Sequence, residues 1–458
     1  MIKTTLFLAA PIALLLAACG TAPLEDTPTR AAQAIDTALP PMKAFSTAHP
    51  VAPTRSNGNI SQDFIDLHFK LESGRALSTF TRFETPITVR VTGHSVGSLN
   101  SDLSRLINRM RREAGIDISQ VSSGTANITI QAVTRAEIRR ALPQAACFVV
   151  PNVSSISDFK RNRNKASTNW SLLRSRERLG IFIPSDASPQ EIRDCLHEEL
   201  AQAIGPLNDL YRLPDSVFND DNVHTVLTGF DMLILRATYA PELRTGMSRA
   251  EVAARLPQIL NRLNPRGAGR ATVSVSPTPR SWVEDVQTAL GPGSDPNTRR
   301  RAANSAASTA VQLGWTDHRR AFSHYMIGRM TQGYDPDLAK RHYQSAMQFL
   351  SRTPNTELHR AYITAQLAAY EVASGNGSAA LNLLNPALPV ASKSENAALL
   401  STLMFLKAEA LDQTGKPNEA RLVRLDSMGW ARYGFGSDWA VRAKMNEIAA
   451  LNPQRRGG

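Results

Sequence analysis

The sequence predicts an α+β domain over residues 61–263, followed by an all-α domain of helical hairpins over residues 299–458. In the first half, short stretches that alternate apolar and polar residues are interleaved with amphipathic stretches, whereas the second half has almost only helical periodicity. A run of glycine, proline and polar residues around a short helix, at 264–298, is predicted as the linker. With 458 residues, 42% of them hydrophobic, the chain is long enough to bury a core in each domain.

Strands and helices alternate in the predicted α+β domain. Strands are expected at 86–92, 126–131, 147–150 and 179–183, and helices at 99–113, 136–142 and 248–263. The clearest helix start is at Ser188, where the hydroxyl is an N-cap, Pro189 takes the first helical position and Glu191 completes a capping pattern. Gly205 is expected to end this helix in a left-handed conformation.

Helix pairs can be written along most of the second half. They fall at 316–331 with 335–350, 358–373 with 377–387, and 396–413 with 417–428. Gly375 and Gly415 lie at successive turns, forty residues apart, which resembles tetratricopeptide repeats of lengthened period. The resemblance implies stacked hairpins with a concave, protein-binding groove, and a plain helical bundle is the alternative.

The first residues have the pattern of an export signal. Lys3 precedes an uncharged apolar run from Leu6 to Ala18, which is too short to span a bilayer. The residues Leu16-Ala17-Ala18-Cys19 resemble the lipobox of bacterial lipoproteins, which implies a signal peptide over 1–18 and a lipid anchor with palmitate on Cys19. Residues 19–60 are predicted as a tether. Because Gly20 is not Asp, the anchor is expected in the outer membrane, facing the periplasm; an ordinary secretory signal is the alternative.

The charge and the cysteines fit an exported protein. The formal net charge is +12, mostly from arginine, which favours contact with the membrane surface or an anionic cell-wall or lipid polymer, while a solvated basic surface is the simpler interpretation. No nucleic-acid-binding motif is present, so no nucleic-acid partner is expected. Cys147 and Cys195 remain once Cys19 is lipidated, and an oxidising compartment favours a disulfide between them over two free thiols.

One stretch, 194–239, has the pattern of a catalytic region. Glu198, Glu199, Gln202, Gly205 and Asn208 occupy the positions of His, Glu, His, Gly and His in the motif H-E-x-x-H-x-x-G-x-x-H. This spacing resembles the metzincins, a group of zincin peptidases that includes the matrixins. The resemblance spans about residues 80–245. Ser216 and Phe218 stand in the turn beneath the metal, the segment 227–239 resembles the closing helix, and 180–183 is the expected substrate-side edge strand.

The resemblance implies a zincin-like, metzincin-type fold with a degenerate metal site. Glu198, Gln202 and Asn208 replace the three histidines, and amides are poor zinc ligands, so neither a catalytic metal nor another cofactor is expected. Glu199 keeps the position of the general base. His197 lies about 100° around the helix from Glu198 and is predicted to be a partly exposed residue rather than a ligand. Residues 219–222 are predicted as an acidic surface turn, and the polar cluster on the helix is predicted to hydrogen-bond the turn at 208–218.

The residues E-E-L-x-Q-A-x-G and P-x-S-x-F-N-D also resemble a bacterial family of exported lipoproteins of unknown function. Three functional hypotheses follow. The first is a scaffold or binding module in which a non-catalytic peptidase-like domain and a helical-repeat domain bind envelope proteins or peptides. The second is an active hydrolase of peptides or cell wall that uses Glu199, and the third is a binder of anionic polymers through the arginine excess.

Overall fold

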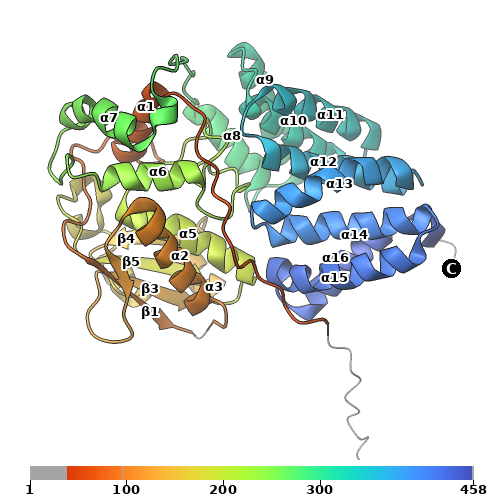
Figure 1. Cartoon of the computed structure of the whole chain (residues 1–458), viewed down its shortest axis with the longest axis horizontal. Helices are drawn as coiled ribbons and strands as arrows, with labels where there is room; N and C mark the ends of the chain where they lie inside the picture. Colours follow the sequence, from red (N-terminus) through yellow and green to blue (C-terminus); the bar gives the residue numbers. More distant parts are fainter. Residues whose placement is uncertain (1–38, 95, 456–458) are drawn as a thin grey trace, which may run out of the picture. The chain divides into compact units, whose positions relative to one another are not determined.

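The computed structural model describes residues 39–94 and 96–455, so the predicted signal peptide, Cys19 and residues 19–38 of the predicted tether lie outside the described residues. In the described residues, an α/β region is followed by a region made only of helices (Figure 1). No helix of this part of the chain is both long and apolar enough to cross a membrane.

The α/β region is built on one mixed sheet of five strands. The strands are β1 (Ile87–Gly93), β2 (Ile118–Gln120), β3 (Ile128–Val133), β4 (Phe148–Pro151) and β5 (Leu179–Pro184), in the order β2-β1-β3-β5-β4. Only β4 runs antiparallel to its neighbour; Ile130 pairs with Val91 on one side and Ile181 on the other. Every residue of β5 is buried.

The prediction that residues 180–183 form an edge strand is therefore wrong. They lie in β5, between β3 and β4, and β4 is the edge strand on that side. The continuous apolar run in β5 is typical of an interior strand that is covered on both faces.

Helices cover the sheet and complete the region. They are α1 (Asn57–His68), α2 (Leu99–Ala114), α3 (Arg135–Ala141), α4 (Ile156–Asn162), α5 (Pro189–Ile204), α6 (Gly229–Thr238) and α7 (Arg249–Leu263). The α5 helix begins as predicted, because the Ser188 hydroxyl accepts a hydrogen bond from the Glu191 amide. It packs on β4, β5 and α2, and its Leu196 and Leu200 are fully buried. This helix is therefore a central element of the α/β core.

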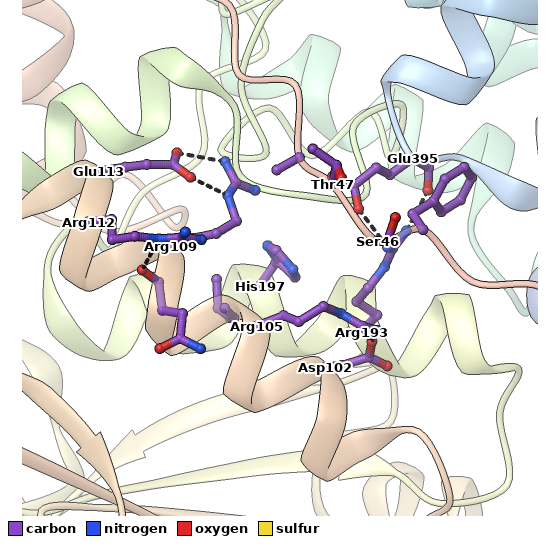
Figure 2. Close-up of a pocket in the computed structure, with 14 residues that line it drawn as sticks. Ser46, Thr47, Asp102, Arg105, Arg109, Arg112, Glu113, Arg193, His197 and Glu395 are labelled. Carbon is purple, nitrogen blue, oxygen red and sulfur yellow. Dashed lines mark hydrogen bonds and ion pairs between the residues drawn. The ribbon is translucent and has the colours of Figure 1, made fainter.

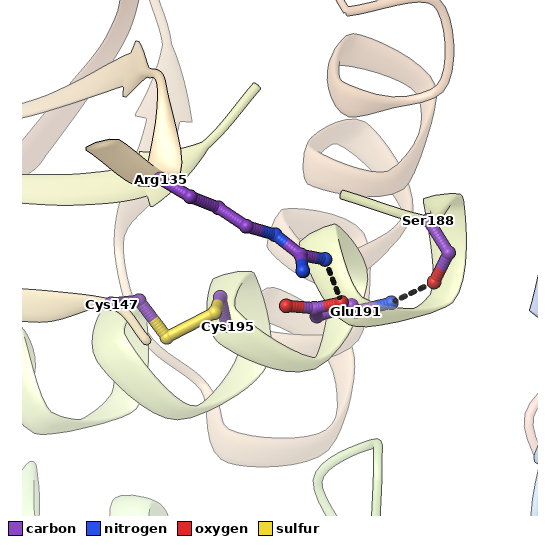
Figure 3. Close-up of a disulfide and its surroundings, with 5 residues drawn as sticks. All are labelled: Arg135, Cys147, Ser188, Glu191 and Cys195. Atoms are coloured by element: carbon purple, nitrogen blue, oxygen red, sulfur yellow. Dashed lines mark hydrogen bonds and ion pairs between the residues drawn. A yellow bond between two sulfur atoms is a disulfide. The ribbon is translucent and has the colours of Figure 1, made fainter. Parts of the chain in front are cut away.

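The predicted disulfide joins Cys147, just before β4, to Cys195 on α5 (Figure 3). The two Cα atoms are 5.9 Å apart, within the usual range for a disulfide. The bond therefore ties the edge of the sheet to the central helix.

The helical region contains nine described helices. They are α8 (Arg280–Leu290), α9 (Pro296–Gln312), α10 (His318–Thr331), α11 (Pro336–Arg352), α12 (Glu357–Ala373), α13 (Gly377–Lys393), α14 (Ala397–Gln413), α15 (Pro417–Phe435) and α16 (Asp438–Ala449). Successive helices pack on each other, and α14 also packs on α12 and α16. The α8 helix lies in the segment predicted as a linker and buries Trp282 against α9 and α10.

The turns between the later helices repeat at intervals of twenty residues. Asn355, Gly375, Glu395 and Gly415 each have a positive φ, of 60°, 77°, 53° and 75°. The three helices between them, α12, α13 and α14, are each 17 residues long. Glycine and asparagine adopt this conformation readily, but a glutamate there is unusual and carries backbone strain. We therefore infer that the side chain of Glu395 has a role that offsets the backbone strain.

An extended segment, 39–56, leads into α1 along the helical region. The Lys43 amide donates to the Gly429 carbonyl at 3.0 Å, and the Phe45 ring stacks on Trp430. At the end of the segment, Arg55 bonds to Asp63 of α1 and to Asp215. The described residues form one compact unit, in which Tyr433 of α15 also hydrogen-bonds Asp102 of α2.

Candidate functional site

The helix α5 and the loop after it bring the predicted site residues together. Glu199 and Gln202 are buried on α5, and Asn208 is buried three residues beyond Gly205. The Asn208 side chain donates a hydrogen bond to the backbone carbonyl of Asp66 at 3.0 Å. The amide at the third metal-ligand position is therefore engaged in holding α1 against this loop.

Arg176 supplies the main contacts at the end of α5. Its buried guanidinium donates to the carbonyls of Gln202, Ala203 and Gly205 at 2.5–2.7 Å and lies over the Trp170 ring. The last carbonyls of a helix lack partners within the helix, so this side chain caps the C-terminus of α5. Burial lowers the pKa of Arg176 to about 10, which leaves it charged at neutral pH.

The left-handed conformation predicted for Gly205 is wrong, because its φ is −155° and its ψ is −106°. In a left-handed cap, backbone amides just after the helix would donate to its last carbonyls. Here the Arg176 guanidinium donates to them instead. A side chain at Gly205 would also lie within 3.6 Å of Leu235, Thr238 and His68. Close packing, rather than a left-handed turn, favours glycine here.

The turn that contains Ser216 and Phe218 is held by Asp231 of α6. The Asp231 carboxylate accepts from the Ser216 hydroxyl at 2.5 Å and from the Val217 amide at 3.2 Å. Phe218 is fully buried in the α/β core. Within the described residues, no hydrogen bond from Glu198, Glu199 or Gln202 to this turn is found, so Asp231 has the stabilising role predicted for that cluster.

Several carboxyl groups around α5 lie close enough to shift one another's pKa. Glu198 and Glu199 lie on the helix, Asp209 and Asp220 in the loop after it, and Glu72 after α1. Burial raises the pKa of Glu199, and the charge of Glu72 raises it further. Burial also raises the pKa of Glu198 and of Asp209, and that of Asp220 to about 6. The surroundings of α5 therefore favour the protonated form of these groups.

The residues present do not fit the zinc ion that a zincin-like fold implies. Across residues 39–94 and 96–455, no group of three or more His, Cys, Asp or Glu side chains is arranged to hold a metal ion. The side chain of Asn208 is bonded to the backbone, and a neutral amide such as Gln202 is a poor zinc ligand. One Oε atom of the buried Glu199 has no hydrogen-bond partner.

Residues 57–258 match the model of a family described as "Protein of unknown function (DUF2927)". A DUF2927 domain therefore occupies this part of the chain. It begins at the first residue of α1 and ends inside α7, so it contains the whole sheet, α5 and the turn at 216–218. No curated protein and no solved structure matches the chain.

His197 lies on another face of α5, about 100° around the helix from Glu198, and the prediction that it is partly exposed is wrong. It is 5% exposed, and its Nδ1 accepts a hydrogen bond from the Leu227 amide at 3.1 Å. Burial and the charges of Arg193 and Arg109 lower its pKa far below the ordinary value, so the ring is neutral. The helix histidine is covered because α2 and the loop before α6 pack against it.

The segment 219–222 of the DUF2927 domain is not the surface turn that the sequence predicts. Asn219 is buried, and the Asp221 carboxylate bonds His359 of α12 at 2.8 Å. The rings of His224 and His318 lie 6.0 and 5.8 Å from that of His359. Burial lowers the pKa of His318 to about 4. The acidic residues of this turn therefore help to join the DUF2927 domain to the helical region.

Four cavities in the described part of the chain have none of Glu198, Glu199, Gln202 and Asn208 in their lining. Sequence reasoning missed Arg176 and Glu72 as neighbours of α5. Arg176 belongs to a basic stretch in which nothing distinguishes it from Arg174 or Arg178, and Glu72 is 126 residues before Glu198. In the sequence, Asp209 and Asp220 stand among other acidic residues of the same loop, and nothing indicates that they lie close to Glu198.

Proposed function

We propose that the chain is a lipid-anchored protein of the bacterial cell envelope, in which a zincin-like region without catalysis and a helical-repeat region bind envelope proteins or peptides. The observation that carries the proposal is the set of hydrogen bonds made by α5 and by the loop after it. Where a metzincin would hold its ion, Asn208 is bonded to the Asp66 carbonyl and the Arg176 guanidinium caps the helix. A buried positive charge at this point disfavours a second cation.

The order of elements supports the zincin-like part of the proposal. A sheet with one antiparallel strand, at its edge, is followed by the central helix α5, then by the turn at 216–218 and the closing helix α6. The stacking of α12, α14 and α16 supports the repeat part. Both parts are scaffolds that place side chains without any need for a metal ion.

A cavity of about 280 Å³ supports the peptide-binding role. It is lined by Asp221 and Val223 of the α/β region and by Phe322, Tyr325 and Ile363 of the helical region. Aromatic side chains around a concave surface are typical of protein-recognition sites. We place a partner's apolar side chain here.

Metal content and turnover test the loss of catalysis. The purified chain is expected to contain far less than one zinc ion per molecule and to show the same background peptidase and cell-wall hydrolase rates as Glu199→Gln. Stoichiometric zinc, or a rate that falls with Glu199→Gln, overturns the proposal. The active-hydrolase alternative is favoured by one observation, the unpartnered oxygen and raised pKa of Glu199, which suit a general acid.

Site-specific crosslinking tests the binding role. A photoreactive residue at Tyr325, which lines the 280 Å³ cavity, is expected to capture a defined envelope protein, and the same residue at the exposed Tyr334 is the control. Equal capture at both positions contradicts the proposed contact. Palmitate labelling of the wild type and of Cys19→Ala tests the anchor separately, since only the wild type is expected to be labelled.

A further inference from the structure

A polar cavity of about 400 Å³ lies between α2 and α5 and is lined by His197 (Figure 2). It is enclosed by α2, α5, residues 45–48 of the extended segment and the turn that holds Glu395. Four arginines line it: Arg105, Arg109 and Arg112 from α2, and Arg193 from α5. A pocket of this volume is large enough for a small molecule or for the headgroup of a lipid.

The carboxylates in the lining do not neutralise all four arginines. The ion pairs are Arg105 with Asp102, Arg109 with Glu113, and Arg193 with Glu395. Among the described residues, Arg112 has no carboxylate partner; its Nε donates only to the Asn108 carbonyl of its own helix. The charged side chains that line the cavity therefore carry a net charge of +1, four positive and three negative.

Several guanidinium donors in the lining are left without acceptors. The Nε of Arg193 is buried with no hydrogen-bond partner, although the whole residue is only 2% exposed. The Nη1 of Arg109 and both Nη atoms of Arg112 take part in no hydrogen bond found between described residues. The buried Nε of Arg193 costs free energy because it lacks an acceptor, whereas the Nη atoms of the exposed Arg112 are free to donate to an oxygen-rich ligand.

His197 adds a further donor. Its Nδ1 accepts from the Leu227 amide, so the neutral ring carries its hydrogen on Nε2. The ring lines the cavity and lies between Arg109 and Arg193 in Figure 2. The ring is thereby fixed as a hydrogen-bond donor.

We propose that this cavity binds a phosphoryl group. In the lining, each of the three carboxylates pairs with one arginine, and the fourth arginine, Arg112, pairs with none of them. A tetrahedral phosphoryl group offers three acceptor oxygens and so accepts from Arg105, Arg109 and Arg112 together, with His197 as a further donor. The group belongs either to a soluble phosphate ester or to a lipid headgroup.

Glu395 is the carboxylate of the helical region that lines the cavity. Its carboxylate bonds Arg193 at 3.0 Å, and it holds a left-handed backbone where the neighbouring turns have glycine or asparagine. The strain is tolerated because the side chain and the backbone carbonyl both accept from Arg193. Since Glu395 belongs to the helical region, it makes the helical region part of the wall of the phosphoryl site.

Titration calorimetry of the full chain in a non-ionic detergent, with inorganic phosphate as the probe, tests the proposal. Saturable binding is expected, and Arg112→Ala should weaken it about tenfold because one charge-assisted contact is lost. The matched control is Arg111→Ala on the same helix, which removes an exposed arginine outside the cavity and should change binding less than twofold. Glu395→Gln should strengthen binding about threefold, since it removes one negative charge from the lining.

Two further probes distinguish the sources of the phosphoryl group. Tighter binding of glycerol 1-phosphate than of dihexanoyl phosphatidylglycerol assigns a soluble ester, and the reverse order assigns a lipid headgroup. Absence of saturable binding by all three probes overturns the proposal, as do equal losses in Arg112→Ala and Arg111→Ala. Acetate binding as tight as phosphate binding also overturns it. If Arg112→Ala does not fold, Arg112→Gln and Arg105→Ala replace it, with the same expected weakening.

Discussion

The interior of the α/β region differs from that of the helical region in the ionisable groups it contains. Nine carboxyl groups of the α/β region have a raised pKa, chiefly because they are buried: Asp63, Glu72, Glu191, Asp194, Glu198, Glu199, Asp209, Asp220 and Asp231. In the described helical region no carboxyl group has a raised pKa, and the shifts at the exposed Asp295 and at Asp317 and Glu371 are all downward. Four carboxyl groups near the surface of the α/β region also have a lowered pKa: Glu84, Glu137, Glu242 and Glu251. Their hydrogen bonds favour the charged form.

The difference indicates that the helical region is built for close apolar stacking, whereas the α/β region is built to hold polar groups. The helical interior is packed largely with alanine and leucine, such as Ala306, Ala368 and Leu403, which stabilise stacking and carry no polar groups. Burying carboxyl groups such as Asp63, Glu199 and Asp231 reduces stability, so their presence in the α/β region is typical of a fold built around a polar site. Five variant experiments test this comparison, in order of falling expected effect, with the Glu371 variant placed beside the Glu199 variant that it matches.

Removing the disulfide tests how far the α/β region depends on a covalent link that the described helical region lacks. The double variant Cys147→Ser, Cys195→Ser opens a link between residues 48 apart. On the chain-entropy model, the free energy of unfolding should fall by about 4 kcal/mol. Urea denaturation followed by circular dichroism measures the change, and wild type with a reductant is the control. A loss below about 1 kcal/mol contradicts this expectation.

Replacing Arg176 tests the buried polar contacts directly. Arg176→Met should lower the free energy of unfolding by about 3 kcal/mol, because three carbonyls at the end of α5 lose their donor. Arg174→Ala, an exposed position in the same stretch, should change it by less than about 0.5 kcal/mol. Equal effects of the two variants would show that the cap does not stabilise α5.

Glu199→Gln tests the raised pKa of a buried acid. Because the pKa of Glu199 is raised above its ordinary 4.5, the folded chain keeps the proton over a pH range where the unfolded chain has lost it. The stability that this proton supports is complete below about pH 4.5 and is lost as the pH rises toward the folded pKa. Glutamine has no such loss, so Glu199→Gln should be more stable than wild type at pH 8, by about 1–2 kcal/mol, and equal to it at pH 4.

Glu371→Gln in the helical region is the matched variant, and its pH dependence should have the opposite sign. The hydrogen bond from Lys340 lowers the pKa of Glu371, so its contribution is present at neutral pH and is lost as the pH falls below 4.5. The variant should be less stable than wild type by about 0.5 kcal/mol at pH 7 and equal at pH 3. Thermal unfolding at each pH measures both variants; the same sign for both would remove the contrast between the regions.

The turn glycines test whether the helical region is a regular repeat. Gly375→Ala and Gly415→Ala place a side chain on residues with a φ of 77° and 75°, where the nearest atoms leave room for it. Each should lower the free energy of unfolding by about 1 kcal/mol through backbone strain alone. Gly333→Ala, with equal room and no positive φ, is the control and should have little effect.

Much of the fold could be predicted because its signals are local. The Ser188 cap, the alternation in the first strand and the turn glycines act over a few residues, and the structure has elements close to the predicted limits. The disulfide was predictable because two cysteines remain after Cys19. The twenty-residue spacing was only half visible, because Asn355 and Glu395 take the other turns without glycine.

The candidate site could be predicted only in part. The sequence placed Glu198, Glu199 and Gln202 on one helix, because a helix follows from local capping and periodicity. It gave no sign that Glu72 approaches them or that Arg176 caps the helix, since those contacts join segments far apart in the chain. The exposure of His197 was wrong for the same reason, as its cover comes from other elements.

The sequence by itself determined the approximate positions of many helices and strands and which ligand positions lack histidine, because both depend on residue type and short spacing. Only the tertiary structure decided that β4, not β5, is the edge strand and which polar groups are buried together. It also decided that arginines of α2 and α5 meet Glu395 around one cavity. The physical reason is that burial and charge pairing depend on distances in space, which residue spacing does not fix across separate segments.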